Sequence, residues 1–356
     1  MQYTSAFICA LLGFAQAGRV PLKQQPLTKT GLESQKIHYQ MVGNGEVPVR
    51  DVTNTQYFVT VEIGTPGQPF NVVPDTGSSN LWVYASNCLS VPCLTHATYN
   101  AKHSSSYKAD GQDFIIQYGS GGVNGKVSRD VATLGEVSAE MGFGEVKSVS
   151  GVTFYVSQMD GILGLAYDSI SVDKLPTFMT SSSEADKSFG FFLHNNPDLS
   201  YMTLPGFEYD NVTLIATHNV IEKTYWNVNL TSLRGPNGSV DVTGYKAAID
   251  SGTSVIVGSS TVIDPLIEGI VVDSTCAGIE SLPDITMTFD STDYVMTYND
   301  YVVKVTEFGV TQCILGFMSM EVPEGFNYLI VGDAFMRRYP TYFNGNDNTV
   351  SFYNYN

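Results

Sequence analysis

From Gln56 onward, short stretches of alternating apolar and polar residues are separated by turn residues. The stretch 57–63 follows this pattern, the turn 64–67 comes next, and the stretch 70–73 leads directly to Asp75. Alternation over runs of this length predicts strands that bury one face, and Gly and Pro mark the turns between them. Stretches with helical periodicity are few and short. The pattern therefore predicts an all-β protein with few short helices.

One sequence unit occurs twice in the chain. Residues 75–79 read Asp-Thr-Gly-Ser-Ser, and residues 250–254 read Asp-Ser-Gly-Thr-Ser. Each copy is followed by an apolar pair and a glycine, at 162–164 and at 330–332. The chain has 356 residues, whereas a single core stops growing near roughly 250 to 300 residues. The repeat and the length together predict two β lobes around a central cleft, which we expect to span 47–195 and 196–356.

The N-terminal part differs from the rest of the chain. Residues 1–17 contain an apolar run and end in Ala-Gln-Ala, which is typical of a signal peptide, although a buried N-terminal strand is the alternative. Residues 18–46 are basic and rich in Gln, Lys, Thr and Pro, and strand periodicity is not visible in them. We interpret 18–46 as a removable propeptide, with a disordered linker as the alternative. No later run reaches the roughly 20 apolar residues of a membrane helix, so the sequence predicts no membrane span.

Charge narrows the range of partners and compartments. The net charge of −17 would repel nucleic acid and anionic membranes, so nucleic acid is excluded as a partner and an acidic compartment is favoured. The sequence does not distinguish among lysosome, vacuole and secretion, and we expect a monomer. The three sequons at Asn211, Asn229 and Asn237 are potential glycosylation sites in a secretory route.

Four cysteines remain once the predicted signal peptide is removed. They are Cys88, Cys93, Cys276 and Cys313, and an even number in an exported chain suggests disulfides. Three pairings are possible, and pairing within each half is favoured because the first two cysteines bracket a short loop. A zinc site is the alternative, but no His or second close Cys pair accompanies these residues.

The repeated motif offers two carboxylates for catalysis. Each aspartate follows an apolar strand at a tight turn, where Gly77 or Gly252 allows another backbone to approach closely. Two carboxyl groups that meet across a pseudo-twofold axis share one proton, so the charged one can deprotonate water and the neutral one can protonate a peptide carbonyl. The hydroxyl residues three positions on, Ser78 and Thr253, are placed to donate hydrogen bonds to the carboxylates, which favours their ionised form and an acidic pH optimum. A single copy would more often be an ordinary turn between strands, but two copies with matched flanks are a specific signal.

The chain resembles the pepsin-like aspartic peptidases from about Arg50 to Tyr353. The resemblance is carried by the motifs at 57–58, 63–66, 75–83, 118–121, 160–166, 249–254, 282–285 and 331–335.

This resemblance implies two β lobes with Asp75 and Asp250 as the catalytic pair, without metal or cofactor. Thr76 and Ser251 would support the pair. Tyr118, Gly119 and Ser120 would form a flap over the substrate, and Trp82 would steady it.

The resemblance also implies two disulfides and an inhibitory propeptide. The disulfides would be Cys88 with Cys93 and Cys276 with Cys313. Residues 19–23 resemble the start of a family propeptide that blocks the cleft, and Lys36 is a candidate for contacting the two aspartates directly, with a solvated lysine as the alternative.

Three residues depart from the family pattern. Pro74 stands where a large apolar residue is usual, and it removes a backbone donor beside Asp75. Because the neighbouring motif is intact, we expect an adapted loop and an active site. Ser251 replaces threonine but keeps the hydroxyl group, and Gly122 replaces a residue that commonly carries a hydroxyl, which would loosen the flap.

The sequence thus favours an acid endopeptidase, made as a zymogen, that cuts peptides and proteins between apolar residues. Val73, Met159 and Ile162 are candidates for contacting apolar substrate side chains. A catalytically inactive relative that only binds peptides is the alternative, and it would be indicated by loss of an aspartate or its glycine. A purely structural β protein would leave the two matched acidic turns unexplained.

Overall fold

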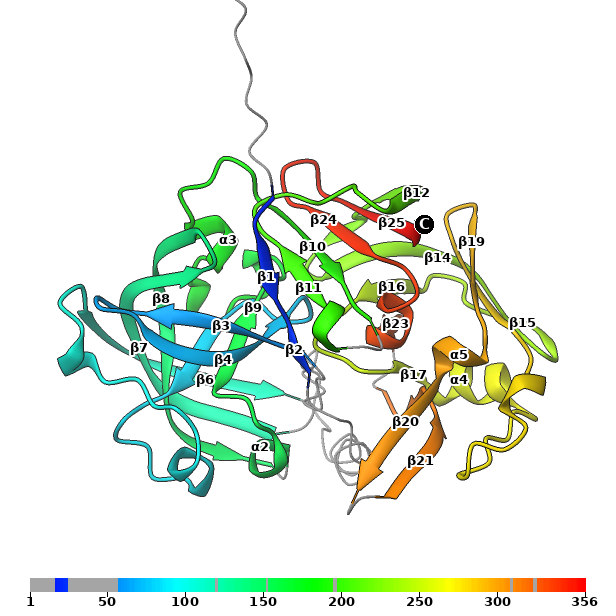
Figure 1. Cartoon of the computed structure of the whole chain (residues 1–356), viewed down its shortest axis with the longest axis horizontal. Coiled ribbons are helices and arrows are strands. Elements are labelled where there is room, and N and C mark those ends of the chain that lie inside the picture. Colours follow the sequence, from blue (N-terminus) through cyan, green and yellow to red (C-terminus); the bar gives the residue numbers. More distant parts are fainter. Residues whose placement is uncertain are drawn as a thin grey trace, which may run out of the picture.

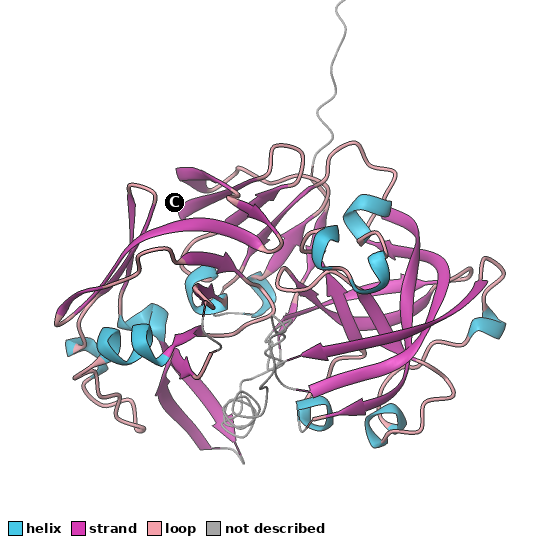
Figure 2. Ribbon diagram, turned by 180° about the vertical axis from the view of Figure 1, so that it is seen from behind, coloured by secondary structure: helices cyan, strands magenta, loops and turns pink. Residues whose placement is uncertain are grey.

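The computed structural model describes residues 17–24, 57–118, 121–151, 153–194, 197–307, 310–322 and 325–356. Strands make up most of both halves of this part, and the longest of its helices is α4 (Ser260–Ile267) (Figure 2). The predicted all-β class is confirmed. Residues 1–16 of the predicted signal peptide lie outside the described residues, as does Lys36. None of the helices in the described ranges is long and apolar enough to cross a membrane.

The first lobe is built on an eight-stranded sheet. Its order is β2 (Lys23–Gln24), β3 (Tyr57–Ile63), β4 (Gln68–Asp75), β9 (Gly161–Gly164), β5 (Leu81–Tyr84), β8 (Val137–Ser150), β7 (Gly121–Leu134) and β6 (Lys108–Tyr118). Short helices α2 (Thr153–Val156) and α3 (Phe178–Ser181) follow the long β7–β8 hairpin. The alternating residues of β3 bury Val59, Val61 and Ile63 completely, as its sequence pattern predicts.

The second lobe is built on a nine-stranded sheet. Its main path is β19 (Thr292–Met296), β18 (Ile285–Phe289), β14 (Trp226–Gly235), β16 (Lys246–Ile249), β23 (Tyr328–Val331), β17 (Ile256–Ser259) and β22 (Phe317–Met320). The short strands β13 (Glu222–Lys223) and β15 (Gly238–Val240) pair with β14. A separate hairpin, β20 (Val302–Glu307) with β21 (Val310–Leu315), lies near α4 and α5 (Tyr298–Tyr301) in Figure 1.

The repeated motif has the same structural setting in each lobe. In the first, β4 runs parallel to β9, and β5 pairs antiparallel with the other side of β9. In the second, β16 runs parallel to β23, and β17 pairs antiparallel with β23. Each aspartate is therefore delivered at the end of a strand that lies beside the later apolar-glycine strand. The predicted two-lobed architecture is confirmed.

A six-stranded sheet combines strands from distant parts of the chain. Its order is β1 (Arg19–Pro21), β11 (Tyr201–Thr203), β10 (Ser188–Phe192), β24 (Thr341–Asn344), β25 (Thr349–Tyr355) and β12 (Val212–Asn219). It lies at the upper end of the molecule in Figure 1, between the two lobes. Short helix α6 (Asp333–Met336) connects β23 of the second lobe to this sheet. This sheet was not predicted from the sequence, because its strands are far apart in the chain.

The first part of the predicted propeptide is ordered as strands, which corrects the expectation that 18–46 has no strand periodicity. β1 pairs with β11, and β2 pairs with β3. Val20 and Leu22 are buried, while Arg19, Pro21 and Lys23 are exposed, so the segment alternates with a period of two. The run is too short for its periodicity to be visible without the sheet edges that it joins.

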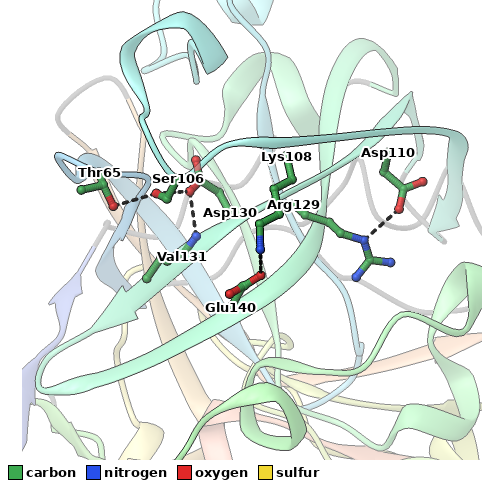
Figure 3. Close-up of polar contacts among 8 residues, drawn as sticks. All are labelled: Thr65, Ser106, Lys108, Asp110, Arg129, Asp130, Val131 and Glu140. Atoms are coloured by element: carbon green, nitrogen blue, oxygen red, sulfur yellow. Dashed lines mark hydrogen bonds and ion pairs between the residues drawn. The ribbon is translucent and has the colours of Figure 1, made fainter.

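Polar contacts between side chains connect the outer strands and loops of the first lobe (Figure 3). The buried Asp130 accepts hydrogen bonds from the Ser106 hydroxyl (2.6 Å), the backbone N–H of Val131 (2.8 Å) and the Tyr99 hydroxyl (2.6 Å). Burial raises the pKa of Asp130, but the hydroxyl donors, with Ser104 and Ser106 foremost, lower it overall. Ionised Asp130 therefore stabilises the folded lobe.

Candidate active site

Asp75 and Asp250 occupy equivalent positions and are both buried, with exposed fractions of 0% and 3%. The backbone N–H of Gly77 donates to Asp75 Oδ1 (2.7 Å), and that of Gly252 donates to Asp250 Oδ1 (2.8 Å). The second oxygen of each carboxyl group accepts a hydrogen bond from a hydroxyl. Ser78 donates to Asp75 Oδ2, and Thr253 donates to Asp250 Oδ2 (2.6 Å). The two half-sites thus have the same donor set at the same sequence spacing.

The two aspartate loops are hydrogen-bonded to each other across the lobes. The Thr76 hydroxyl donates to the carbonyl of Ile249 (2.8 Å), and the Ser251 hydroxyl donates to the carbonyl of Pro74 (2.6 Å). The backbone N–H groups complete the exchange, because that of Ser251 donates to Thr76 Oγ1 (2.9 Å) and that of Thr76 donates to Ser251 Oγ (3.1 Å). These four buried bonds fix the distance between the loops. Ser251 needs only its hydroxyl group for this contact.

Glycine is required at two positions because each loop lies against the opposite carboxyl group. A Cβ atom on Gly77 would lie 2.5 Å from Asp250 Oδ1, and one on Gly252 would lie 2.2 Å from Asp75 Oδ1. Both distances are well below van der Waals contact, so any side chain would push the carboxyl groups apart. Both glycines and both aspartates are in place, so the mark of an inactive relative is absent from these motifs.

The electrostatics of the pair favour a shared proton. Burial raises the pKa of Asp75 well above its usual range, and the negative charge of Asp250 raises it further. The hydrogen bonds from Ser78 and Gly77 oppose this rise, while a hydrogen bond between the carboxyl groups of Asp75 and Asp250 adds to it. The arrangement keeps one proton on the pair at pH values where an ordinary carboxyl group is ionised.

A third buried carboxyl group, Asp333, lies close to this pair and is not predicted as a site residue. Its backbone N–H donates to the carbonyl of Thr253 (2.7 Å), and neither carboxyl oxygen accepts a hydrogen bond from the described residues. Burial raises the pKa of Asp333 well above its usual range, Arg337 lowers it, and the charge of Asp250 raises it. Its position within the motif at 331–335 could have indicated it.

The aromatic residues of the predicted flap meet in the first lobe. Trp82 Nε1 donates to the Tyr118 hydroxyl (2.6 Å), and both side chains are fully buried. Phe154, which the sequence analysis does not single out, packs against both, with ring centroids 6.0 Å from Trp82 and 6.4 Å from Tyr118. Tyr118 ends β6 and pairs with Gly121 of β7, while Gly119 and Ser120 lie outside the described residues.

Pro74 is accommodated at the end of β4. The pairing of β3 with β4 ends at Val59 opposite Val72. Pro74 lies beyond this pairing, so no hydrogen bond from its backbone nitrogen to β3 is required. On the other side it pairs with Leu163 of β9, and its carbonyl accepts the hydrogen bond from Ser251. The missing donor is therefore compatible with the strand.

A small apolar recess adjoins Asp250 on the side of the second lobe. Its lining consists of Thr76, Gly77, Tyr225, Ala248, Ile249, Asp250, Phe326, Tyr328 and Ile330. The candidates Val73, Met159 and Ile162 do not belong to this lining. They are completely buried in the cluster beneath Trp82 and Tyr118, so the expectation that they contact substrate is not supported by their position. The recess was not predicted from the sequence because its residues come from four separate segments.

Both disulfides form as the family resemblance implies, Cys88 with Cys93 and Cys276 with Cys313.

The three sequons differ in their surroundings. Asn211 and Asn237 are exposed. The half-buried Asn229 donates from its amide to Asp290 Oδ1 (3.2 Å), and the amide of Asn237 donates to the carbonyl of Glu268 (3.0 Å).

Comparisons with known proteins agree with the geometry. The family model "Eukaryotic aspartyl protease" matches residues 56–355. The chain is 36% identical to "Cathepsin D" of Chionodraco hamatus, over 94% of each protein. It is 37% identical to "Cathepsin D" of Dictyostelium discoideum, over 86% of this chain and 85% of the relative. It is 35% identical to the "Vacuolar aspartic protease" of Candida albicans, over 92% of this chain and 82% of the relative.

Proposed function

Because this chain belongs to the eukaryotic aspartyl protease family and is an aspartic-type endopeptidase, we propose that Asp75 and Asp250 are its catalytic residues. One observation carries the proposal: the two buried carboxyl groups have matched donors on loops that are hydrogen-bonded to each other. Thr76, Ser78, Ser251 and Thr253 are then positioning residues.

The pair activates one water molecule. The ionised carboxylate removes a proton from water as the water oxygen bonds to the peptide carbonyl carbon, while the neutral carboxyl group gives its proton to the carbonyl oxygen. Proton transfer to the amide nitrogen then accompanies cleavage of the C–N bond. Aspartic proteases are the established example of such proton sharing. Because burial and mutual repulsion raise the pKa of the pair, one carboxyl group of Asp75 and Asp250 is neutral while the other is charged.

The acidic optimum follows from this assignment. At very low pH both carboxyl groups are protonated and the base is lost, and at higher pH the pair loses the shared proton that the carbonyl oxygen must receive. The active, singly protonated form is therefore most abundant at acidic pH. Hydrogen bonds from Ser78 and Thr253 extend its range toward low pH, because they favour ionised carboxylates.

Substrate lies between the aspartates and the end of the β6–β7 hairpin. Tyr118, with Gly119 and Ser120, closes over it and excludes water, while Trp82 steadies Tyr118 through their hydrogen bond. The recess beside Asp250 accepts an apolar substrate side chain, since its walls include Tyr225, Phe326 and Tyr328.

Residues 18–46 act as an inhibitory propeptide. Support comes from β1 and β2, which insert into sheets of the folded protein and bury Val20 and Leu22. Arg19 forms an ion pair with Glu208 and lies over the ring of Tyr201 (4.7 Å to its centre). Lys23 donates to Asn71 Oδ1 (2.7 Å). These contacts anchor the segment before the chain continues toward Lys36.

The mature enzyme is a glycosylated monomer of a lysosomal, vacuolar or secretory compartment. The relatives named vacuolar aspartic protease, the predicted signal peptide and the acidic composition support this location. Asn211 and Asn237 are compatible with attached glycans because they are exposed. A glycan on Asn229 would replace its hydrogen bond to Asp290.

The purified zymogen is acidified to about pH 3 to 4, near the reference pKa values of carboxyl groups, and its mass and its cleavage of a denatured protein are followed. We expect wild type to lose the N-terminal segment and to cut the substrate. Asp75→Asn and Asp250→Asn should remain folded and inactive. Asp130→Asn is the matched control, because Asp130 is also buried and bonded to hydroxyl groups but lies outside the site. Full activity in either Asp75→Asn or Asp250→Asn would overturn the assignment.

A further inference from the structure

The loop closed by Cys88 and Cys93 carries an exposed apolar tip, formed by Leu89, Val91 and Leu94. Their exposed fractions are 94%, 61% and 81%, and they are three of the four most exposed large apolar side chains in the described ranges. Soluble proteins scatter such side chains singly, so their concentration within six residues indicates a contact surface.

The loop holds this tip on a fixed frame. The disulfide joins its two ends, and Cys93 is buried in the core cluster that contains Trp82. Two of its backbone donors are satisfied internally: Leu89 N–H donates to the carbonyl of Lys147 (3.1 Å), and Cys93 N–H donates to the carbonyl of Ser90 (3.1 Å). Pro92 has no donor. The tip can therefore leave water without stranding these N–H groups, which is a requirement for entry into lipid.

The charges around the apolar tip are unusual for this chain. The whole sequence has 35 acidic residues, yet none occurs from Thr76 to Ala109, the stretch that contains the tip. Lys147, whose carbonyl holds the loop, adds a positive charge. The tip therefore carries no carboxylate in its own segment, and Lys147 beside it is available to the phosphate of a lipid headgroup.

A neighbouring aromatic residue extends the apolar tip. Helix α2 lies beside the 3₁₀ turn Val91–Leu94, and its Tyr155 has an exposed fraction of 54%. Tyrosine is enriched where membranes meet water, because its ring is apolar and its hydroxyl is polar. Figure 1 shows α2 at the end of the molecule opposite the six-stranded sheet.

We propose that the apolar tip and Tyr155 form a lipid-contacting surface, which inserts into the headgroup region of a zwitterionic bilayer. Stable protein interfaces bury about 800 Å² on each partner, more than one short convex loop provides, whereas a bilayer accepts a small projecting tip. The net charge of −17 disfavours strongly anionic membranes, so phosphatidylcholine is the matching surface. This inference does not depend on the catalytic assignment.

Flotation of the full chain with phosphatidylcholine vesicles tests the proposal. We expect wild type to float with the vesicles and the triple variant Leu89→Ser, Val91→Ser, Leu94→Ser to partition at least about 100-fold more weakly, since each buried apolar side chain contributes roughly tenfold or more. The control variant Val271→Ser, Val310→Ser removes apolar side chains that are 79% and 59% exposed elsewhere, and it should bind like wild type. Cleavage of a soluble peptide verifies that each variant is folded.

Direct insertion is measured with Leu89→Trp, whose emission should shift to shorter wavelength and be quenched by brominated lipid. Failure of wild type to float, or equal losses in the loop and control variants, would overturn the proposal. Sedimentation of the protein without lipid tests whether the tip instead joins two protein molecules. If wild type self-associates and the triple serine variant does not, the tip is a protein–protein contact and the lipid surface is rejected.

Discussion

Thr253→Val isolates one hydrogen bond of the catalytic pair without changing the size of the side chain. The Thr253 hydroxyl donates to Asp250 Oδ2 over 2.6 Å in a buried environment. A hydrogen bond to a charged group contributes about 1.5 to 3 kcal/mol, and one pKa unit corresponds to about 1.4 kcal/mol. Loss of this bond should therefore raise the lower apparent pKa of the pair by about 1 to 2 units.

The assay is kcat/KM for a soluble peptide as a function of pH. The acidic limb of the profile should move toward neutral pH by about 1 to 2 units, because more of the enzyme is then doubly protonated at low pH. Thr341→Val is the matched control: its buried hydroxyl donates to the carbonyl of Tyr339 (2.9 Å), so the variant should lose stability and keep the pH profile. An acidic limb that stays in place or moves to lower pH in a folded Thr253 variant would refute the reasoning.

Three further changes test the flap, the close approach of the loops and the first lobe. Trp82→Phe removes the donor to Tyr118 and should lower kcat/KM by up to about tenfold, the value of one hydrogen bond, and an unchanged rate in steady-state assays would contradict this. Gly252→Ala places a Cβ 2.2 Å from Asp75 Oδ1 and should cost at least about 100-fold in kcat while the chain still folds; near-normal turnover would show that the loop can yield. Asp130 has a lowered pKa in the folded state, so its ionised form stabilises the protein above the unfolded pKa and this stability disappears as pH falls through the folded pKa. Asp130→Asn should therefore lower Tm at pH 7 more than at pH 2, and equal losses at both pH values would argue against this role.

Much of the fold was predictable because its signals are local. Alternation in residues 57–63 depends only on the pleat of one strand, and β3 indeed buries that face. The repeated aspartate motif revealed two related units because a turn of the same geometry requires the same residue types in each lobe. The family motifs also implied both cysteine pairs, which the structure forms.

Other features depend on partners that are distant in sequence. Strands β1 and β2 form because the edges of β11 and β3 are available, although the segment itself is short and basic. The motif at 331–335 marks the position of Asp333, but its raised pKa depends on burial and on the charge of Asp250, which only the tertiary structure supplies. Val73, in turn, is apolar and close to Asp75 in sequence, but its strand turns it into the core.

The sequence by itself determined the two acidic turns, their hydroxyl and glycine neighbours and the β character of the chain, because each of these depends on a local pattern of a few residues. The tertiary structure decided how the turns meet: that the two carboxyl groups share a proton, which hydroxyl crosses to the other lobe, and which apolar side chains remain in water. The physical reason is that desolvation and charge coupling depend on distances between atoms. Those distances are set only when segments separated by many residues pack together.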